Sequence, residues 1–169
     1  MVPRKTPEQL LTNGEFGSPP SSRGFDWRVA PVEGVSVSQE EHGLRVTFSG
    51  HEPEECEALA QLVPLKENTR YELKFGYRTS GLGTGQGLGW RVTDENSGSV
   101  LSEGSVLASE ADQEGRLNFE TPRECRLVRV ALRYQRSPGT TRIEGFLTLR
   151  SVQLKAAVQS PIVGTLVRK

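Results

Sequence analysis

The chain has 169 residues, and 21 Lys and Arg residues balance 21 Asp and Glu residues, so the formal net charge is zero. This length suits a single domain with a substantial core, and the balanced charge gives no reason to expect a nucleic-acid partner. No apolar run approaches the roughly 18–20 residues of a membrane span, so we expect no membrane insertion.

The pattern along the chain is that of many short strands. The 18 glycines and 10 prolines disfavour long helices and suit tight turns. Residues 1–9 are polar and predict a flexible N-terminal segment, while residues 156–169 predict a C-terminal tail or linker. Between them we expect, in chain order, strands at 10–16, 26–29, 34–39, 44–48, 59–65, 71–79, 88–92, 117–121, 128–134 and 146–154.

Strict alternation marks the best-defined strands. Residues 71–79 and 128–134 place apolar side chains two apart, which is the period of a strand with one buried face. The last strand loses this spacing near Arg150 and Ser151, which predicts a bulge. Short strands separated by turns about every 8–12 residues indicate an all-β fold, a two-sheet antiparallel β-sandwich of jelly-roll topology.

The same parity predicts the core. The residues turned inward include Leu44, Val46, Phe48, Leu73, Phe75, Tyr77, Trp90, Val92, Val128, Val130 and Leu132. Tyr71, Phe119 and Tyr134 share that parity, so most of the aromatic residues belong to the core. No exposed aromatic stripe for stacking on sugar rings is visible. Trp27 follows a loop and is kept as a candidate ligand contact.

Several segments resemble one known family. The opening Asn13-Gly14-Glu15-Phe16, the Trp27 that follows, the stretch 61–75 (QLVPLKENTRYELKF) and the closing 146–154 (FLTLRSVQL) are similar to galactose-binding-like jelly rolls. Carbohydrate-binding modules of families 4 and 9 are of this kind. The resemblance covers about residues 10–155 and assigns them to one sandwich domain. Its motifs are mainly packing motifs, so they specify the fold better than the ligand.

The resemblance implies a non-catalytic, carbohydrate-binding accessory domain of a larger bacterial-type protein. Its partners would be a polysaccharide or glycan and the other domains of the parent protein, and an extracellular or periplasmic location is slightly favoured. The alternative is a protein-interaction or structural spacer domain with no sugar ligand.

The residues opposite the core suggest where a ligand would bind. Lys74, Arg78, Arg91, Arg129, Arg133 and Gln135 all point outward on three strong strands. If those strands are neighbours, they form one basic face able to bind sugar hydroxyls or carboxylates. The alternative is a solvated face of cross-strand Arg–Glu pairs.

Cofactor and catalytic signals are weak. Modules of this kind often hold a structural calcium ion beside an acidic residue after the opening Phe, where this chain has Gly17. With only 3 Asp, we expect no cofactor and no metal site, calcium held by Glu15 and backbone carbonyls being the alternative. His42 and His51 lie in polar turns, so no catalytic residue is assigned.

The two cysteines leave two readings open. Cys56 and Cys125 each stand just before an expected strand. They would form a disulfide if those strand starts lie at one end of the sandwich, and would otherwise be two inert thiols.

Overall fold

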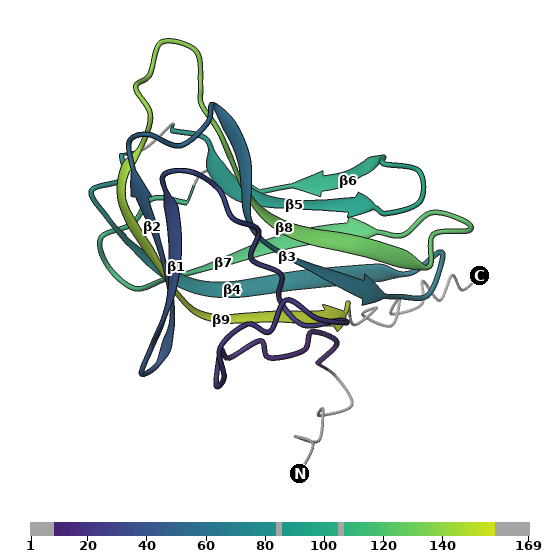
Figure 1. Ribbon diagram of the computed structural model, residues 1–169. Helices are drawn as coiled ribbons and strands as arrows, with labels where there is room; N and C mark the ends of the chain where they lie inside the picture. Colours follow the sequence, from purple (N-terminus) through teal and green to yellow (C-terminus); the bar gives the residue numbers. More distant parts are fainter. Residues whose placement is uncertain (1–8, 84–85, 105–106, 158–169) are drawn as a thin grey trace, which may run out of the picture.

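The computed structural model describes residues 9–83, 86–104 and 107–157, which form two antiparallel sheets packed face to face (Figure 1). The strands of this part are β1 (Val35–Glu40), β2 (Gly43–Ser49), β3 (Glu55–Pro64), β4 (Arg70–Ser80), β5 (Leu88–Asp94), β6 (Val100–Glu103), β7 (Gln113–Glu120), β8 (Leu127–Gln135) and β9 (Glu144–Ala156). The predicted all-β sandwich is therefore confirmed. In the described residues no helix is long and apolar enough to cross a membrane.

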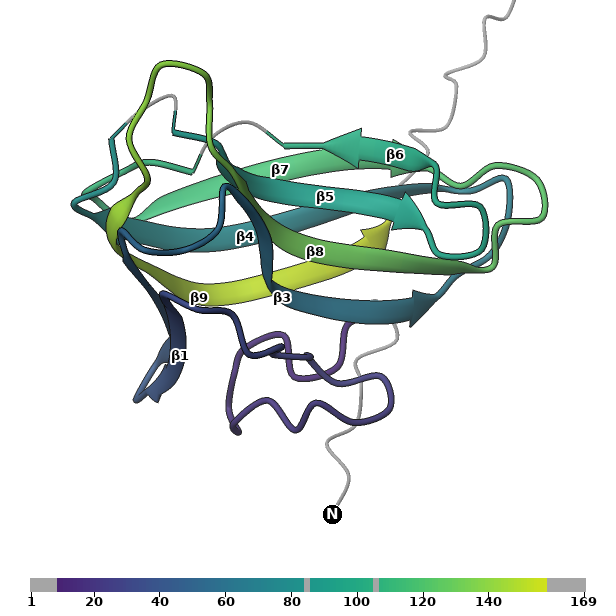
Figure 2. The same cartoon turned by 45° about the horizontal axis from the view of Figure 1, so that its top comes forward.

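Strand order places distant parts of the chain side by side. One sheet has the order β1-β2-β9-β4-β7 and the other the order β3-β8-β5-β6. The chain passes repeatedly from one sheet to the other, so that β3 and β5 flank β8 in the four-stranded sheet (Figure 2). Each sheet thus has an inner face toward the core and an outer face toward solvent.

The core follows the predicted alternation. Along β4 the odd-numbered residues 71–79 are buried and the even-numbered ones 72–78 are partly exposed. All eleven core residues predicted from parity are buried, as are Tyr71, Phe119 and Tyr134. The aromatic residues pack on one another inside the sandwich, with Phe75 against Tyr77 and Trp90 at ring centroid distances of 5.8 and 5.9 Å. Burying such large rings provides much of the stabilisation.

The N-terminal part differs from the prediction. Residues 10–16 are not a strand, because Asn13 and Phe16 adopt φ values of 53° and 55°, outside extended geometry. The segment still lies along β9, where the Leu10 amide donates to Leu154 and the Val152 amide to Gly14. The strand expected at 26–29 is reduced to a single bridge that joins Arg28 to Ala60 of β3.

This segment covers one open side of the sandwich, and Trp27 is its anchor. The indole ring is 0% exposed, stacks on Phe16 at 5.6 Å, and donates from Nε1 to the Asn13 carbonyl at 3.0 Å. Gln61 of β3 fixes the same segment by pairing its amide with the backbone of Thr12. Trp27 is therefore a core residue, and its candidate role as a ligand contact is wrong.

Three further expectations are decided by the strand pairing. The bulge in the last strand is confirmed, because β9 shifts register against β4 between Leu149 and Ser151. The disulfide reading is wrong, since both cysteines are free. Cys56 of β3 is the cross-strand partner of Tyr134, near the last residue of β8, whereas Cys125 comes just before the first residue of β8. The two cysteines therefore lie toward opposite ends of the β3–β8 pair. The predicted terminal segments 1–9 and 156–169 lie almost wholly outside the described residues.

Candidate ligand-binding faces

The predicted basic face is divided between the two sheets. Arg91 of β5 and Arg129, Arg133 and Gln135 of β8 lie on the outer face of the four-stranded sheet. Lys74 and Arg78 belong to β4 in the other sheet. The hypothesis of one face that joins all six residues is therefore wrong. Parity decides which side of its own sheet a residue occupies, but it does not say which sheet its strand joins.

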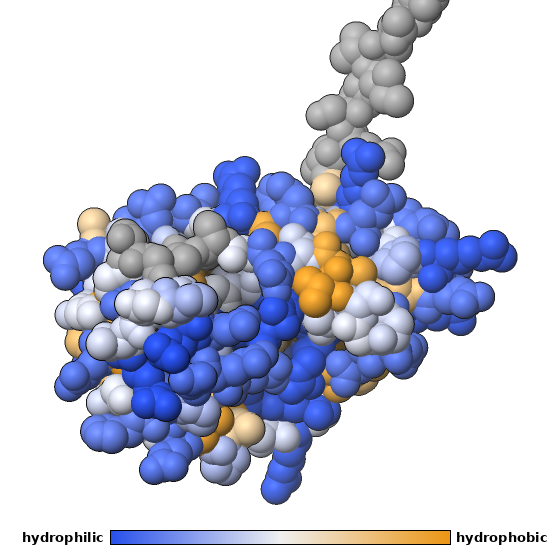
Figure 3. Space-filling view, turned by 90° about the horizontal axis from the view of Figure 1, so that it is seen from above, coloured by the Kyte–Doolittle hydropathy of each residue, from blue (hydrophilic) through white to orange (hydrophobic). Residues whose placement is uncertain are grey.

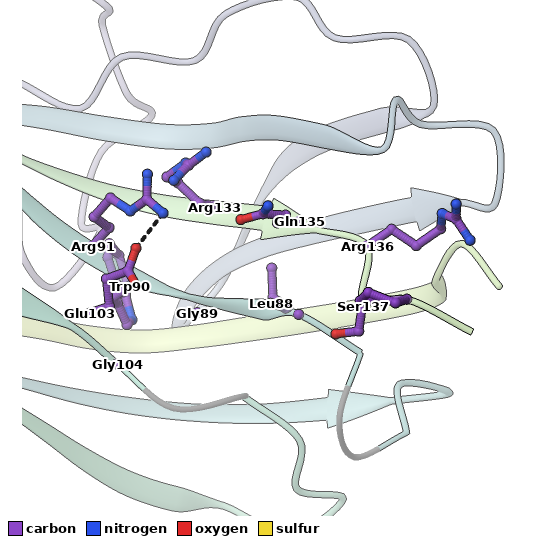
Figure 4. A pocket seen from close by; sticks show the side chains of 12 residues that line it. Leu88, Gly89, Trp90, Arg91, Glu103, Gly104, Arg133, Gln135, Arg136 and Ser137 are labelled. Carbon is purple, nitrogen blue, oxygen red and sulfur yellow. Dashed lines mark ion pairs between the residues drawn. The ribbon is translucent and has the colours of Figure 1, made fainter. Parts of the chain in front are cut away.

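Three of the predicted residues do meet in a hollow of about 280 Å³ on the outer face of the four-stranded sheet. Arg91, Arg133 and Gln135 line it, together with Arg136 and Ser137 of the turn after β8. Figure 4 shows the guanidinium groups of Arg91 and Arg133 on the same side of these strands.

The bottom of this hollow is formed by glycines, which have no side chain to fill it. Gly89 is the cross-strand partner of Arg133, so no side chain stands opposite the arginine on β5. Gly104 continues the floor beyond β6, with its amide bonded to the Trp90 carbonyl at 2.7 Å. At Gly87, where φ is 87°, a Cβ would lie 1.8 Å from the Gln135 carbonyl, so only glycine fits. Gly87 and Gly89 thus form part of the lining of the hollow.

Every arginine of the hollow is paired with a glutamate. Arg91 forms an ion pair with Glu103, and Arg136 reaches Glu54 at 2.7 Å. Arg133 pairs with Glu55, and its side chain is only 15% exposed whereas that of Glu55 is 58% exposed. The positive charges are therefore matched one to one, and the hollow has no net charge. Figure 3 shows this outer face as mostly hydrophilic, with apolar atoms confined to small areas.

Arg129 lies on the same outer face but does not line the hollow. Its guanidinium binds Glu57 of β3 through Nε at 2.9 and 3.1 Å and also through Nη2. These hydrogen bonds, which Arg129 donates to the Glu57 carboxylate, raise the pKa of Arg129 above its ordinary value, against the opposing effect of burial. Arg129 therefore joins two neighbouring strands, β8 and β3.

The two residues on the other sheet have different surroundings. Lys74 lies 3.4 Å from Glu114 of β7. Arg78 lines a second hollow, of about 300 Å³, together with Glu110 and Phe146. The ring of Phe146 points outward, and the guanidinium of Arg45 lies 4.0 Å from its centroid.

Sequence reasoning missed several lining residues. Glu103 stands in β6, a strand of four residues that lies between the strands predicted at 88–92 and 117–121 and was not itself predicted. Arg136 and Ser137 follow the last alternating residue of β8 and belong to a turn that the sequence does mark with Pro138 and Gly139. What the sequence lacked was the strand order that brings this turn beside β5.

The described residues contain no candidate metal centre. No group of three His, Cys, Asp or Glu side chains is placed to hold a metal ion there. Burial, followed by the charge of Glu52, raises the pKa of the Cys56 thiol to about 11. Cys56 is thus a poor nucleophile near neutral pH.

The described strands and their order define a sandwich of the kind that carbohydrate-binding modules have. CBM4, a carbohydrate-binding module, matches it with a TM-score of 0.62 at 13% identity, over 87% of this chain and 99% of that one. TmCBM61 in complex with β-1,4-galactotriose matches with a TM-score of 0.56 at 17% identity, over 88% of this chain and 99% of that one.

Larger enzymes contain the same fold. The arabinose-bound MgGH51 α-L-arabinofuranosidase matches with a TM-score of 0.61 at 12% identity, over 88% of this chain but only 26% of that one. No family model and no curated protein matches the sequence. At these identities the likeness establishes the fold, and the resemblance drawn from the sequence motifs is confirmed at that level.

Proposed function

We propose that this protein is a non-catalytic carbohydrate-binding module, and that it binds a glycan in the hollow on the outer face of the four-stranded sheet. The observation that carries the proposal is the likeness to CBM4 and TmCBM61, which extends over 99% of each of those chains. The match to about a quarter of an arabinofuranosidase chain supports a role as an accessory domain of a larger protein.

The hollow offers chemistry that suits sugar hydroxyls. Each hydroxyl can donate one hydrogen bond and accept others. An arginine–glutamate pair such as Arg91–Glu103 presents N–H donors beside carboxylate acceptors, which matches two neighbouring hydroxyls of a sugar ring. The Gln135 amide adds one more donor and acceptor, and Ser137 adds a hydroxyl. Because glycines form the bottom of the hollow, a sugar ring has room to approach.

The ion pairs also hold the hollow in its binding shape. Arg133 is mostly covered and its position is fixed by Glu55, so little side-chain freedom remains to be lost on binding. Because each positive charge is already matched, the hollow favours a neutral glycan over an acidic one. Binding there should accordingly depend weakly on salt.

Affinity electrophoresis against a panel of neutral polysaccharides tests this proposal. Gln135→Ala and Arg133→Ala should each weaken binding by about tenfold, which corresponds to the roughly 1.4 kcal/mol expected for one lost hydrogen bond. Arg116→Ala is a matched control, because Arg116 lies on β7 of the other sheet. Thermal unfolding of each variant separates lost binding from lost folding. Absence of binding by the wild type, or equal binding by all variants, would refute the proposal.

A spacer or protein-interaction domain is the second candidate, and one observation favours it. Among the described residues that line the hollow, Trp90 is the only aromatic one, and its ring is 1% exposed and packs inward on Trp27. The hollow thus lacks a flat ring for stacking on a sugar. A wild type that binds no polysaccharide but binds another domain of its parent protein would favour this candidate.

A further inference from the structure

One strand arginine differs from all the others. The structure describes eight arginines within strands, and seven of them form ion pairs with Asp or Glu, namely Arg45, Arg70, Arg91, Arg116, Arg129, Arg133 and Arg150. Arg78 is the eighth, and its guanidinium has neither an ion pair nor a hydrogen bond to any described residue. It is half-buried, so its guanidinium is partly removed from water without a counter-charge.

A second polar group beside Arg78 also lacks a hydrogen-bond partner among the described residues. Arg45 of β2, Thr148 of β9 and Arg78 are aligned across three neighbouring strands on the outer face of the five-stranded sheet. Thr148 is fully buried between the two arginines, and its hydroxyl has no hydrogen-bond partner among the described residues. The middle of this face therefore holds two guanidinium groups and, between them, a hydroxyl that forms no hydrogen bond with the described residues.

The hollow beside Arg78 supplies two other kinds of contact. Phe146, two residues before Thr148, lines the hollow, and the guanidinium of Arg45 lies 4.0 Å from the centroid of its ring. Glu110 and Ser80 line it as well, and Glu110 forms no ion pair with Arg78. The hollow therefore combines an aromatic ring, a carboxylate acceptor, a hydroxyl and an unpaired guanidinium.

We propose that this second hollow binds a uronic acid unit of an acidic glycan, with Arg78 as the partner of the sugar carboxylate. A guanidinium binds a carboxylate through two parallel N–H donors, which completes the pairing that every other strand arginine already has. Phe146 contacts the apolar face of the sugar ring. The Glu110 carboxylate accepts hydrogen bonds from the sugar hydroxyls, and the Ser80 hydroxyl donates to them or accepts from them. This site goes beyond the proposed function, since it lies on the opposite sheet and takes a charged ligand.

Polygalacturonate and its fully methyl-esterified form provide the sharpest test, because esterification removes the charge of each carboxyl group and adds only a methyl group to the polymer. The wild type should bind polygalacturonate at least tenfold more tightly than the ester, and the difference should shrink as salt rises. Arg78→Gln should remove this preference. Arg78→Lys keeps the charge without the planar donor pair and should restore only part of it.

Two control variants assign the effect to this hollow. Arg70→Gln removes another outward arginine of β4, one whose side chain is 71% exposed, and should leave polygalacturonate binding unchanged. Gln135→Ala alters the hollow on the four-stranded sheet and should also leave it unchanged, so that failure of the proposed function and failure of this inference can be told apart. Phe146→Ala should weaken the binding of both polygalacturonate and its methyl ester.

Three results would overturn the inference. They are equal affinity for the acid and the ester, unchanged polygalacturonate binding by Arg78→Gln in a folded protein, and binding of poly-glutamate as tight as that of polygalacturonate. The last would show that the site recognises acidic peptide and not the sugar.

Discussion

Replacing Gly115 by alanine should destabilise the sandwich, because the added methyl group would collide with the ring of Phe75. Gly115 of β7 is the cross-strand partner of Phe75 in β4. A Cβ built on Gly115 would lie 2.3 Å from Cε2 and 2.6 Å from Cζ of that ring. The ring has little room to retreat, since it packs against Tyr77 and Trp90.

The expected magnitude follows from two opposing effects. Forcing extra volume into a packed core costs about 1–3 kcal/mol. Alanine alone would favour the strand by about 0.5–1 kcal/mol over glycine, and the backbone of Gly115 is not in the left-handed region, so this gain is available. In a Phe75→Leu background the Cε2 and Cζ atoms are gone, and Gly115→Ala should become neutral or slightly stabilising. The double-mutant cycle should therefore give a coupling of about 2 kcal/mol.

Urea unfolding followed by tryptophan fluorescence measures all four proteins of the cycle. Gly17→Ala is the matched control, because a Cβ there meets nothing within 4 Å, and it should change the free energy of unfolding little. If Gly115→Ala costs nothing in the wild type, or costs the same in both backgrounds, the steric reasoning is refuted.

Two other variants or conditions test separate parts of the fold. In the folded protein, Cys56 should react slowly with iodoacetamide at pH 8 and faster only as the pH approaches its pKa of about 11. In the unfolded chain the same thiol should have a pKa near the ordinary value of 9.0 and react faster at pH 8. Equal rates for the folded and unfolded protein at pH 8 would contradict the burial of this thiol. The folded state then holds this proton more tightly than the unfolded chain between those two values, so that this group makes the free energy of unfolding fall as pH rises through that range. Gln61→Leu should lower the free energy of unfolding by about 1–3 kcal/mol, because the Thr12 amide and carbonyl both lose their partner. Chemical denaturation measures it, with the exposed Gln113→Leu as control, and equal effects of the two changes would show that the Thr12 contacts contribute nothing.

Local alternation carried most of the fold prediction. In β4 and β8 the two-residue period of side-chain direction decides which residues are buried, and Phe75 and Val130 are buried as that period requires. The bulge at Arg150 was visible for the same reason, as a break in the period. Where the backbone leaves extended geometry, as at Asn13 and Phe16, the period no longer applies and the expected strand was wrong.

The sequence by itself therefore determined the class of fold, the inward residues and the outward arginines of each strand. Only the tertiary structure decided which outward residues are neighbours, because strand order depends on contacts between residues far apart in the chain. That order separates Arg78 from Arg133 and places Glu55 beside Arg133, whereas Arg78 receives no such partner among the described residues. It also buries Trp27, whose loop position in the sequence says nothing about the side of the sandwich that it covers. A ligand site on a sheet face is a set of cross-strand neighbours, so its composition is fixed only when the strands are assembled.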